Sequence, residues 1–208
     1  MTEGKITIDG QDVRDLTQHE LREKLGYVPQ KGVLFSGNIA SNIMFGNPAG
    51  SEQEMTEAAQ IAQAVEFIDT KPERYKSPIS QGGANVSGGQ KQRVALARTM
   101  VMKPKILLLD EPLSALDGVI KESIKSKIKE IAREFSLTTI IVTHDPEEAL
   151  TLSDKVLIIN DGEIAQYGTP KEIIQQPADD FVENFILNQL EIKRTNIFHL
   201  FAECAATA

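Results

Sequence analysis

The sequence lacks the features that several protein classes require. It has one cysteine, Cys204, which excludes an internal disulfide framework and a cysteine-based zinc site. No run approaches the roughly 20 continuous apolar residues of a membrane-spanning helix. Residues 1–5 lack the charged-then-apolar pattern of a secretory signal. The 22 Lys and Arg residues are outnumbered by 30 Asp and Glu residues, and this acidic balance argues against broad nucleic-acid binding, which needs a basic face. We therefore expect a cytosolic protein with no nucleic-acid partner.

The composition is that of an ordinary globular protein. Hydrophobic residues make up 41% of the chain and charged residues 25%, which excludes a disordered or fibrous class. With 208 residues, the chain is long enough to bury a core in one domain, or in one domain with a small subdomain.

Local signals in the first half predict short strands and capped helices. Thr17 with Glu20, and Ser51 with Glu54, have the spacing of capping boxes at helix starts. The expected elements are a strand at 5–10, a helix at 17–25, a strand at 26–29, a mostly helical region at 37–67 and a loop at 71–83.

The second half alternates strand and helix signals, which predicts a parallel α/β sheet. Two apolar runs, 106–109 and 139–142, read as strands buried on both faces. Asp145, Pro146 and Glu148 supply an N-cap, a first-turn proline and a capping-box acid for a helix. Residues 156–165 form a hairpin with a tight turn, and Thr169, Pro170 and Glu172 start a further helix. A helix from Val119 carries an apolar stripe at Ile120, Ile124, Ile128, Ile131 and Phe135.

Residues 87–90, Ser-Gly-Gly-Gln, allow two interpretations. Ser87 and Gln90 have the spacing of a capping box, so the segment is consistent with an ordinary helix start. Gly88 and Gly89 would also leave free amides without side chains at a helix N-terminus, which is a site for an anion. From the residues alone the two interpretations are about even.

Two carboxylates, Asp110 and Glu111, follow the strand at 106–109. At the carboxyl edge of a parallel sheet they suit ligand binding, with Asp110 holding Mg²⁺ or its water and Glu111 polarising an attacking water. A solvated acidic loop is the ordinary alternative for a single Asp-Glu pair. Gln30, Asp117 and His144 are uninformative when each is taken alone.

Taken together and in order, these residues resemble the nucleotide-binding domain of ATP-binding-cassette (ABC) transporters, from Lys5 to about Ile186. Gln30 matches the Q-loop, residues 86–90 the family signature, residues 106–110 the Walker B strand, residues 114–117 the D-loop and His144 the switch histidine. The resemblance implies an α/β P-loop NTPase (RecA-like) fold with an inserted helical subdomain at about 36–100. It also implies an ATPase domain over residues 1–187 and a C-terminal helical extension or tail at 188–208.

The resemblance further implies ATP and Mg²⁺ as ligands. Glu111, His144 and Gln30 are the expected catalytic residues, and Asp110 and Gln30 the expected metal ligands. Ser87, Gly88, Gly89, Gln90 and Asp117 are expected to contact nucleotide. Expected partners are a second ATPase domain in a head-to-tail dimer and a transmembrane domain, at the inner face of the cell membrane.

One family motif is missing from the 208 residues. No Gly-x-x-x-x-Gly-Lys-[Ser/Thr] occurs, so the chain lacks the backbone cradle and lysine for the β- and γ-phosphates, and the hydroxyl that binds Mg²⁺. We therefore expect the isolated chain neither to bind ATP tightly nor to hydrolyse it. The family's phosphate-loop strand lies within the sheet beside the strand ending near Thr143. Its absence predicts a gap or open edges there, unless the strands close up or another chain supplies the missing one.

The motifs also mix two styles. Residues 1–102 resemble an exporter-type domain and residues 103–187 an importer-type domain, with Asp145 where exporters usually have arginine. A natural mosaic, a recombinant and an engineered chimera all fit this pattern. In the family, the surface that meets the transmembrane helices lies between the Q-loop and the signature, so the exporter-like half is expected to select that partner.

Two functions of different classes follow. The first is an ATPase domain that couples ATP hydrolysis to transport when complete. The second is a non-enzymatic fragment that lends only residues 87–90 to a complete partner domain. Soluble relatives in DNA repair or on the ribosome rank third, because their long coiled coils or basic linkers are absent here.

Overall fold

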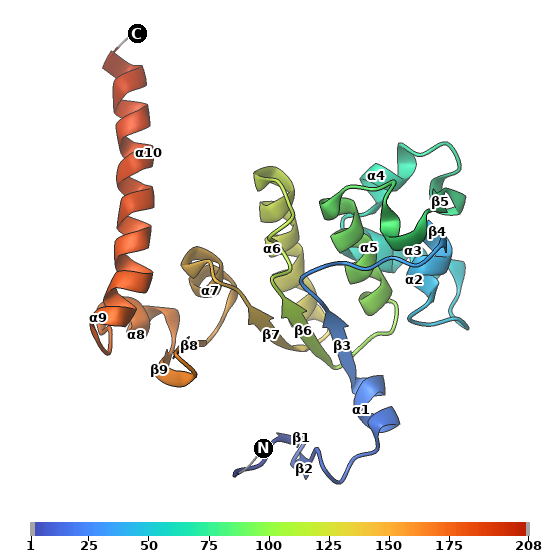
Figure 1. Ribbon diagram of the computed structural model, residues 1–208, viewed down its shortest axis with the longest axis horizontal. Helices are drawn as coiled ribbons and strands as arrows, with labels where there is room; N and C mark the ends of the chain where they lie inside the picture. The colour runs from blue at the N-terminus through green and yellow to red at the C-terminus, as the bar shows by residue number, and fades with distance from the viewer. Residues whose placement is uncertain (1–2, 207–208) are drawn as a thin grey trace. The chain divides into compact units, whose positions relative to one another are not determined.

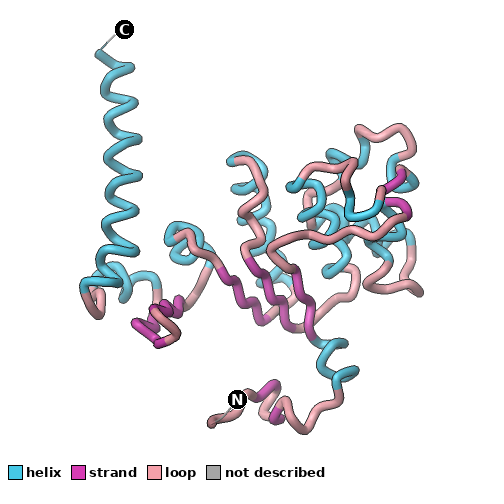
Figure 2. The backbone as a smooth tube through the Cα atoms, viewed as in Figure 1, coloured by secondary structure: helices cyan, strands magenta, loops and turns pink. Residues whose placement is uncertain are grey.

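The computed structural model describes residues 3–206, which divide into two compact units at residues 142 and 143. Figure 1 shows the order of the helices and strands in each unit, and Figure 2 shows which segments are helix, strand or loop. Each unit is described by itself.

The first unit is organised around a parallel sheet of order β3-β6-β7, formed by Leu25–Val28, Ile106–Asp110 and Thr138–Val142. Leu109 of β6 lies between Val28 of β3 and Ile141 of β7 in the register. The prediction of a parallel α/β sheet is therefore confirmed. Because all three strands run the same way, their carboxyl ends meet at one edge, and Gln30, Asp110 and Glu111 lie at or just after those ends.

A helical region lies between β3 and β6 in the sequence. Its helices are α2 (Ile39–Met44), α3 (Glu52–Ile61), α4 (Val65–Asp69) and α5 (Gly88–Met100), and α2 and α3 both pack on α5. The predicted capping box of Ser51 and Glu54 is present at the start of α3. The segment at 71–83 was expected to be a loop, but it holds the 3₁₀ turns η1 (Arg74–Lys76) and η2 (Gln81–Gly83) and the strand β5 (Pro78–Ile79). β5 forms an antiparallel pair with β4 (Gly37–Asn38), in which Ile79 lies opposite Gly37 and Pro78 lies opposite Asn38. This pairing gives the expected loop regular structure.

The first unit also contains a small hairpin and two helices that lie outside the helical region. Gln11–Asp12 (β2) pairs with Thr7–Ile8 (β1) in a small hairpin, and α1 (Gln18–Lys24) begins at the predicted Thr17–Glu20 capping box. The helix α6 (Gly118–Glu134) buries Ile124, Ile128 and Ile131, as its apolar stripe predicted. The two ends of the stripe differ: Ile120 is only partly buried, and Phe135 is the C-cap and 53% exposed, because the helix ends before the stripe completes its next turn.

The strand β7 differs from the prediction of a fully buried strand. Within residues 3–206 it pairs only with β6, so it is the edge of its sheet, and Ile140 and Val142 are 52% and 50% exposed. A parallel strand normally has neighbours on both sides, and this one has an open row of backbone donors and acceptors.

The second unit holds the predicted hairpin and five helical segments. β8 (Val156–Asn160) and β9 (Glu163–Gly168) pair across a turn in which Asp161 and Gly162 both have positive φ, which is typical of a tight hairpin turn. The helical segments are α7 (Pro146–Leu152), α8 (Pro170–Gln175), α9 (Asp180–Val182), the π-helical η3 (Glu183–Asn188) and α10 (Gln189–Ala206).

The core of this unit joins the hairpin to α8, α9 and η3 through Val156, Ile158, Ile173, Val182 and Ile186. Residues 204–208 were expected to fray, but α10 continues to Ala206, and residues 207 and 208 lie outside the described part of the chain.

Candidate functional site

The carboxyl edge of the sheet brings together Gln30 and the two carboxylates. Gln30 lies two residues after β3 and is exposed, and Asp110 is the last residue of the adjacent strand β6. The hydroxyl of Tyr27 on β3 donates a hydrogen bond to Asp110 Oδ2 at 3.3 Å. Burial raises the pKa of Tyr27, and the charge and hydrogen bond of Asp110 raise it further. Tyr27 therefore stays a neutral donor that orients the Asp110 carboxylate, a role that its place in the motif did not reveal.

Glu111 stops the strand through its backbone. Its φ of 47° lies in the left-handed region, which costs a non-glycine residue about 1–3 kcal/mol. Its amide donates to the carbonyl of Val142 at 2.8 Å, and its own carbonyl accepts from the hydroxyl of Ser114 at 3.0 Å. These bonds hold the strained residue at the edge of the sheet, directly after Asp110.

The start of α5 has the predicted capping box. Ser87 Oγ accepts from the Gln90 amide at 3.2 Å, and Gln90 Oε1 accepts from the Ser87 amide at 3.1 Å. Ser87 and Gly88 are exposed at this end of the helix. The local interpretation of residues 87–90 is thus confirmed, and their contact with an anion stays a prediction.

Gly89 shows why this helix start needs a glycine. A Cβ atom at Gly89 would lie 3.1 Å from the carbonyl oxygen of Ala115 and 3.2 Å from Leu116, whereas one at Gly88 would meet Ala115 at an ordinary 3.5 Å. The signature segment of this chain therefore packs against its own residues 114–117, two predicted motifs far apart in the sequence.

Asp117 serves as the N-cap of α6. Its Oδ1 accepts a hydrogen bond from the amide of Ile120 at 3.2 Å, so part of its carboxylate is engaged in local structure.

Arg93 on α5 is buried, and burial lowers its pKa, while the charges of Glu66 and Asp117 act in the opposite direction. The Arg93 guanidinium donates to the carbonyl of Gln63 at 2.9 Å and lies 4.9 Å from the ring centre of Phe67.

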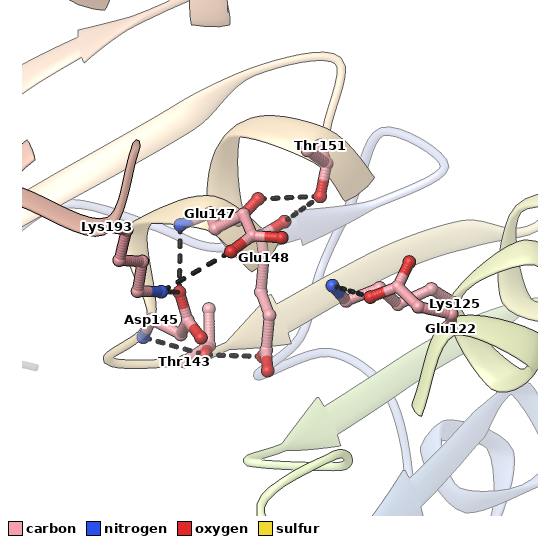
Figure 3. A network of polar contacts seen from close by, with 8 residues as sticks. All are labelled: Glu122, Lys125, Thr143, Asp145, Glu147, Glu148, Thr151 and Lys193. Carbon is pink, nitrogen blue, oxygen red and sulfur yellow. Dashed lines mark hydrogen bonds and ion pairs between the residues drawn. The ribbon is translucent and has the colours of Figure 1, made fainter. Parts of the chain in front are cut away.

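His144 lies in the second unit, between Thr143 and the N-cap of α7, and is exposed. Glu148 was expected to complete a capping box with Asp145, and this is wrong. Thr143 Oγ1 donates to Glu148 Oε2 at 2.8 Å and accepts from the Asp145 amide at 3.1 Å (Figure 3). The threonine hydroxyl therefore occupies the position between the acid and the N-cap amide.

The start of α7 is also bound from α10. Lys193 Nζ lies 3.2 Å from Asp145 Oδ1 and 3.4 Å from Glu147 Oε2 (Figure 3). Burial lowers the pKa of Lys193, but the hydrogen bonds and charges of Asp145 and Glu147 outweigh it, so its pKa is raised overall. Sequence reasoning missed Thr143, Glu148 and Lys193 as a group, because they come from a strand end and two helices.

A second group that the sequence did not reveal surrounds Arg98 on α5. Its guanidinium donates to the carbonyls of Asn42 and Val33, both at 2.9 Å, and to Asn42 Oδ1 at 2.8 Å. It also lies 4.8 Å from the ring centre of Phe35 and 6.0 Å from that of Phe45. Burial lowers the pKa of Arg98.

The same group carries exposed apolar side chains on its outer side. Val33, Phe35 and Phe45 are 56%, 45% and 62% exposed, and the two phenylalanine rings are 4.7 Å apart. We call these three residues the aromatic patch. It lies between Gln30 and Ser87 in the sequence, in the region where the resemblance placed a partner surface.

The donors at the sheet edge suit Mg²⁺ in type but not in number. Asp110 and Gln30 offer the oxygen ligands that Mg²⁺ prefers. Within residues 3–206, however, no group of three or more His, Cys, Asp or Glu side chains could hold a metal ion by itself. These residues therefore fit an ion held mainly by phosphate oxygens and water, to which the protein adds one or two ligands.

A cavity of about 720 Å³ lies at the opposite end of the sheet. Ile106 and Thr138, the first residues of β6 and β7, line it together with Phe135 and Lys103. It is therefore not the candidate site.

Among residues 3–206, no helix is both long and apolar enough to cross a membrane.

Comparisons with known proteins point to one family. Residues 1–114 match the family model described as ABC transporter. The chain is 36% identical over 196 residues to a multidrug efflux ATP-binding/permease protein of Mycobacterium bovis, an alignment that covers 90% of this chain and 16% of that protein. It is also 36% identical over 208 residues to the sulfate/thiosulfate import ATP-binding protein CysA of Bacillus cereus, covering 95% of this chain and 53% of that one.

A solved structure agrees with these matches. A bacterial Atm1-family ABC exporter with ATP bound superposes with a TM-score of 0.83 and 37% sequence identity, covering 90% of this chain and 32% of that chain. The chain thus spans about half or less of the length of these relatives. Proteins named for efflux and for import both match most of the chain, in line with its mixed motifs.

Proposed function

Because this chain belongs to the ABC transporter family as an ATP-binding domain, we propose that it acts in ATP-driven transport across a membrane, together with a phosphate loop that its 208 residues do not contain. The observation that carries the proposal is the sheet edge, where Gln30, Asp110 and Glu111 follow two adjacent parallel strands. In this proposal the chain supplies one part of an ATPase domain at the cytoplasmic face of a membrane transporter.

The residues of the matched motifs each have a role in the proposed reaction. Glu111 orients the attacking water, and its strained, hydrogen-bonded backbone keeps the carboxylate in place. Gln30 and Asp110 hold Mg²⁺ or its waters, and Tyr27 fixes the Asp110 carboxylate. His144 contacts the terminal phosphate, and Mg²⁺ supplies charge neutralisation when it is bound.

The isolated chain lacks ATPase activity under this proposal. Positioning and electrostatic stabilisation do most of the work in phosphoryl transfer, and the phosphate loop supplies much of both. Without that loop, Glu111 has no held phosphate beside it.

Residues 87–90 and Asp117 act on a second ATPase domain. Ser87 and Gly88 are exposed at the start of α5, and the helix dipole favours a negative ligand there. They cap the γ-phosphate held by the phosphate loop of the partner in a head-to-tail dimer. The aromatic patch is the surface that meets the transmembrane partner.

The missing loop favours one alternative function, in which the chain donates residues 87–90 and performs no chemistry itself. The two functions differ in what Glu111 does. In a dimer in which the missing phosphate loop is restored to this chain by fusion, Glu111→Gln lowers turnover if this chain takes part in hydrolysis, and has no effect if it only donates its signature segment.

Sedimentation of this chain with the ATP-binding domain of the Atm1-family exporter tests the proposal. We expect association with Mg-ATP and none without it. Ser87→Glu places a negative charge against the phosphate and abolishes association, whereas Ser87→Thr keeps the cap hydroxyl and retains it. Association that is independent of ATP, or unaffected by Ser87→Glu, contradicts the proposal, as does family-like single-turnover hydrolysis by the purified chain alone.

A further inference from the structure

The backbone on both sides of His144 is fixed by a single hydroxyl group. Thr143 Oγ1 donates to Glu148 at 2.8 Å and accepts from the amide of Asp145 at 3.1 Å (Figure 3). This one atom of residue 143 is therefore bonded both to Glu148 and to the backbone of residue 145. His144 lies between residues 143 and 145, and its side chain is exposed. The bonds at residues 143 and 145 therefore fix the backbone to which the His144 side chain is attached.

Glu148 is the fixed point of this arrangement. Glu148 is 3% exposed, and burying a carboxyl group is costly unless hydrogen bonds compensate it. It lies in the first turn of α7, whose N-cap Asp145 accepts from the amide of Glu147 at 2.9 Å. Lys193 holds the outer side of the same cap.

The arrangement differs from an ordinary capping box in one respect. In a capping box the acid at the third helical position accepts directly from the N-cap amide, and its influence ends at the N-cap. Here the hydroxyl of Thr143 lies between Glu148 and the Asp145 amide. The acid thereby holds a residue before His144 as well as the one after it.

We propose that Glu148 is a positioning residue for His144 and acts through the hydroxyl of Thr143. The inference rests on the proposed function for what His144 does at the phosphate, and on the structure alone for how His144 is held. In these bonds the Thr143 hydroxyl contacts both Glu148 and the amide of Asp145, so it is the hydrogen-bonded connection that the experiment has to break.

The imidazole signals of the full chain test this proposal by ¹⁵N–¹H NMR at a fixed pH. The chain has three histidines, so His19 and His199 serve as internal controls. Thr143→Val removes the hydroxyl while keeping the shape of the side chain, and we expect it to shift or broaden the His144 signal alone. The amide of Asp145 should exchange its hydrogen roughly tenfold faster, the scale of one lost hydrogen bond.

Two conservative variants separate the hydrogen bond from other effects. Thr143→Ser keeps the hydroxyl, and Glu148→Gln keeps an acceptor without the charge, so both should retain the His144 signal of the unaltered chain. Glu148→Ala should reproduce the effect of Thr143→Val, and the double variant should add nothing further. Where Glu148→Ala unfolds the second unit, Thr143→Val decides.

An unmoved His144 signal in Thr143→Val overturns the inference, and so does an equal change in all three histidines, which indicates a purely structural role. Because no nucleotide is needed, the result is independent of the sedimentation experiment. ATP-dependent association with an unmoved His144 signal refutes this inference alone, and the reverse result refutes the proposed function alone.

Discussion

Arg98 and Asn42 are joined by two hydrogen bonds that connect the signature helix to the aromatic patch. The guanidinium of Arg98 donates to the side-chain oxygen of Asn42 at 2.8 Å and to its backbone carbonyl at 2.9 Å. Asn42 is buried and in turn binds the amide and the carbonyl of Phe35. The end of α5 is therefore bound to the segment that presents Phe35 and Phe45.

Replacing Arg98 with lysine tests the strength of this link. Lysine keeps the charge but lacks the planar guanidinium that bonds three acceptors at once. The Asn42 and Val33 acceptors therefore lose donors. We expect Arg98→Lys to lower the free energy of unfolding by ~2 kcal/mol in urea denaturation. Arg22→Lys on the exposed side of α1 is the control, and a loss of equal size there would contradict the explanation.

Alanine at the two glycines of α5 should act in opposite directions. Gly88→Ala adds a methyl group at an ordinary 3.5 Å from Ala115, and the helix propensity of alanine makes it neutral or stabilising by up to ~1 kcal/mol. Gly89→Ala places the methyl group 3.1 Å from the carbonyl oxygen of Ala115 and should destabilise. Thermal denaturation of the two variants measures the difference, and similar melting temperatures would argue against the close approach.

The N-cap of α5 gives a smaller effect that is independent of nucleotide. Ser87→Ala removes the hydroxyl that accepts from the Gln90 amide, and should cost about 1 kcal/mol of stability. Ser87→Thr keeps that acceptor and should lie close to the unaltered chain in the same urea titration. If both variants lose equal stability, the cap does not contribute as described.

The hairpin at the start of the chain should show a local pH response. The side-chain hydrogen bond from Arg14, followed by its backbone hydrogen bond, lowers the pKa of Asp12 from 3.8 to about 2. Because the folded pKa is depressed, the contribution of this pair is complete above the unfolded pKa and is lost as the pH falls through about 2. We expect carboxyl NMR titration to give a pKa near that value, and Arg14→Gln to return it toward 3.8. An unchanged pKa in Arg14→Gln would assign the shift to another cause.

The sequence predicted best what depends on neighbouring residues. The helix starts at Thr17, Ser51, Ser87 and Thr169 were all expected and all have capping boxes, because the bonded groups lie three residues apart. The same reasoning failed at Glu148, where the spacing was right but a hydroxyl from outside the helix replaced the expected contact. Local spacing does not indicate which side chain from a preceding strand will intervene.

Sequence reasoning did not predict the contacts between distant segments. Asp110 and Glu111 were expected at the carboxyl edge of the sheet and lie there, whereas the position of Gln30 after the adjacent strand β3 came from the structure. Tyr27 as a donor to Asp110, and Arg98 as the link to Asn42, required the packing of separate elements to be known. The exposure of Ile140 and Val142 contradicts the prediction of a strand buried on both faces, but it agrees with the open edge that the missing phosphate-loop strand predicted beside the strand ending near Thr143.

The open side of β7 has a practical consequence for handling this protein. Within residues 3–206, β7 pairs with a strand on one side only, and such an edge with exposed Ile140 and Val142 is a template for intermolecular strand addition. Preparations should therefore precipitate more readily as the concentration rises. Ile140→Lys introduces a gatekeeper charge at this position and should raise the concentration that stays in solution after centrifugation.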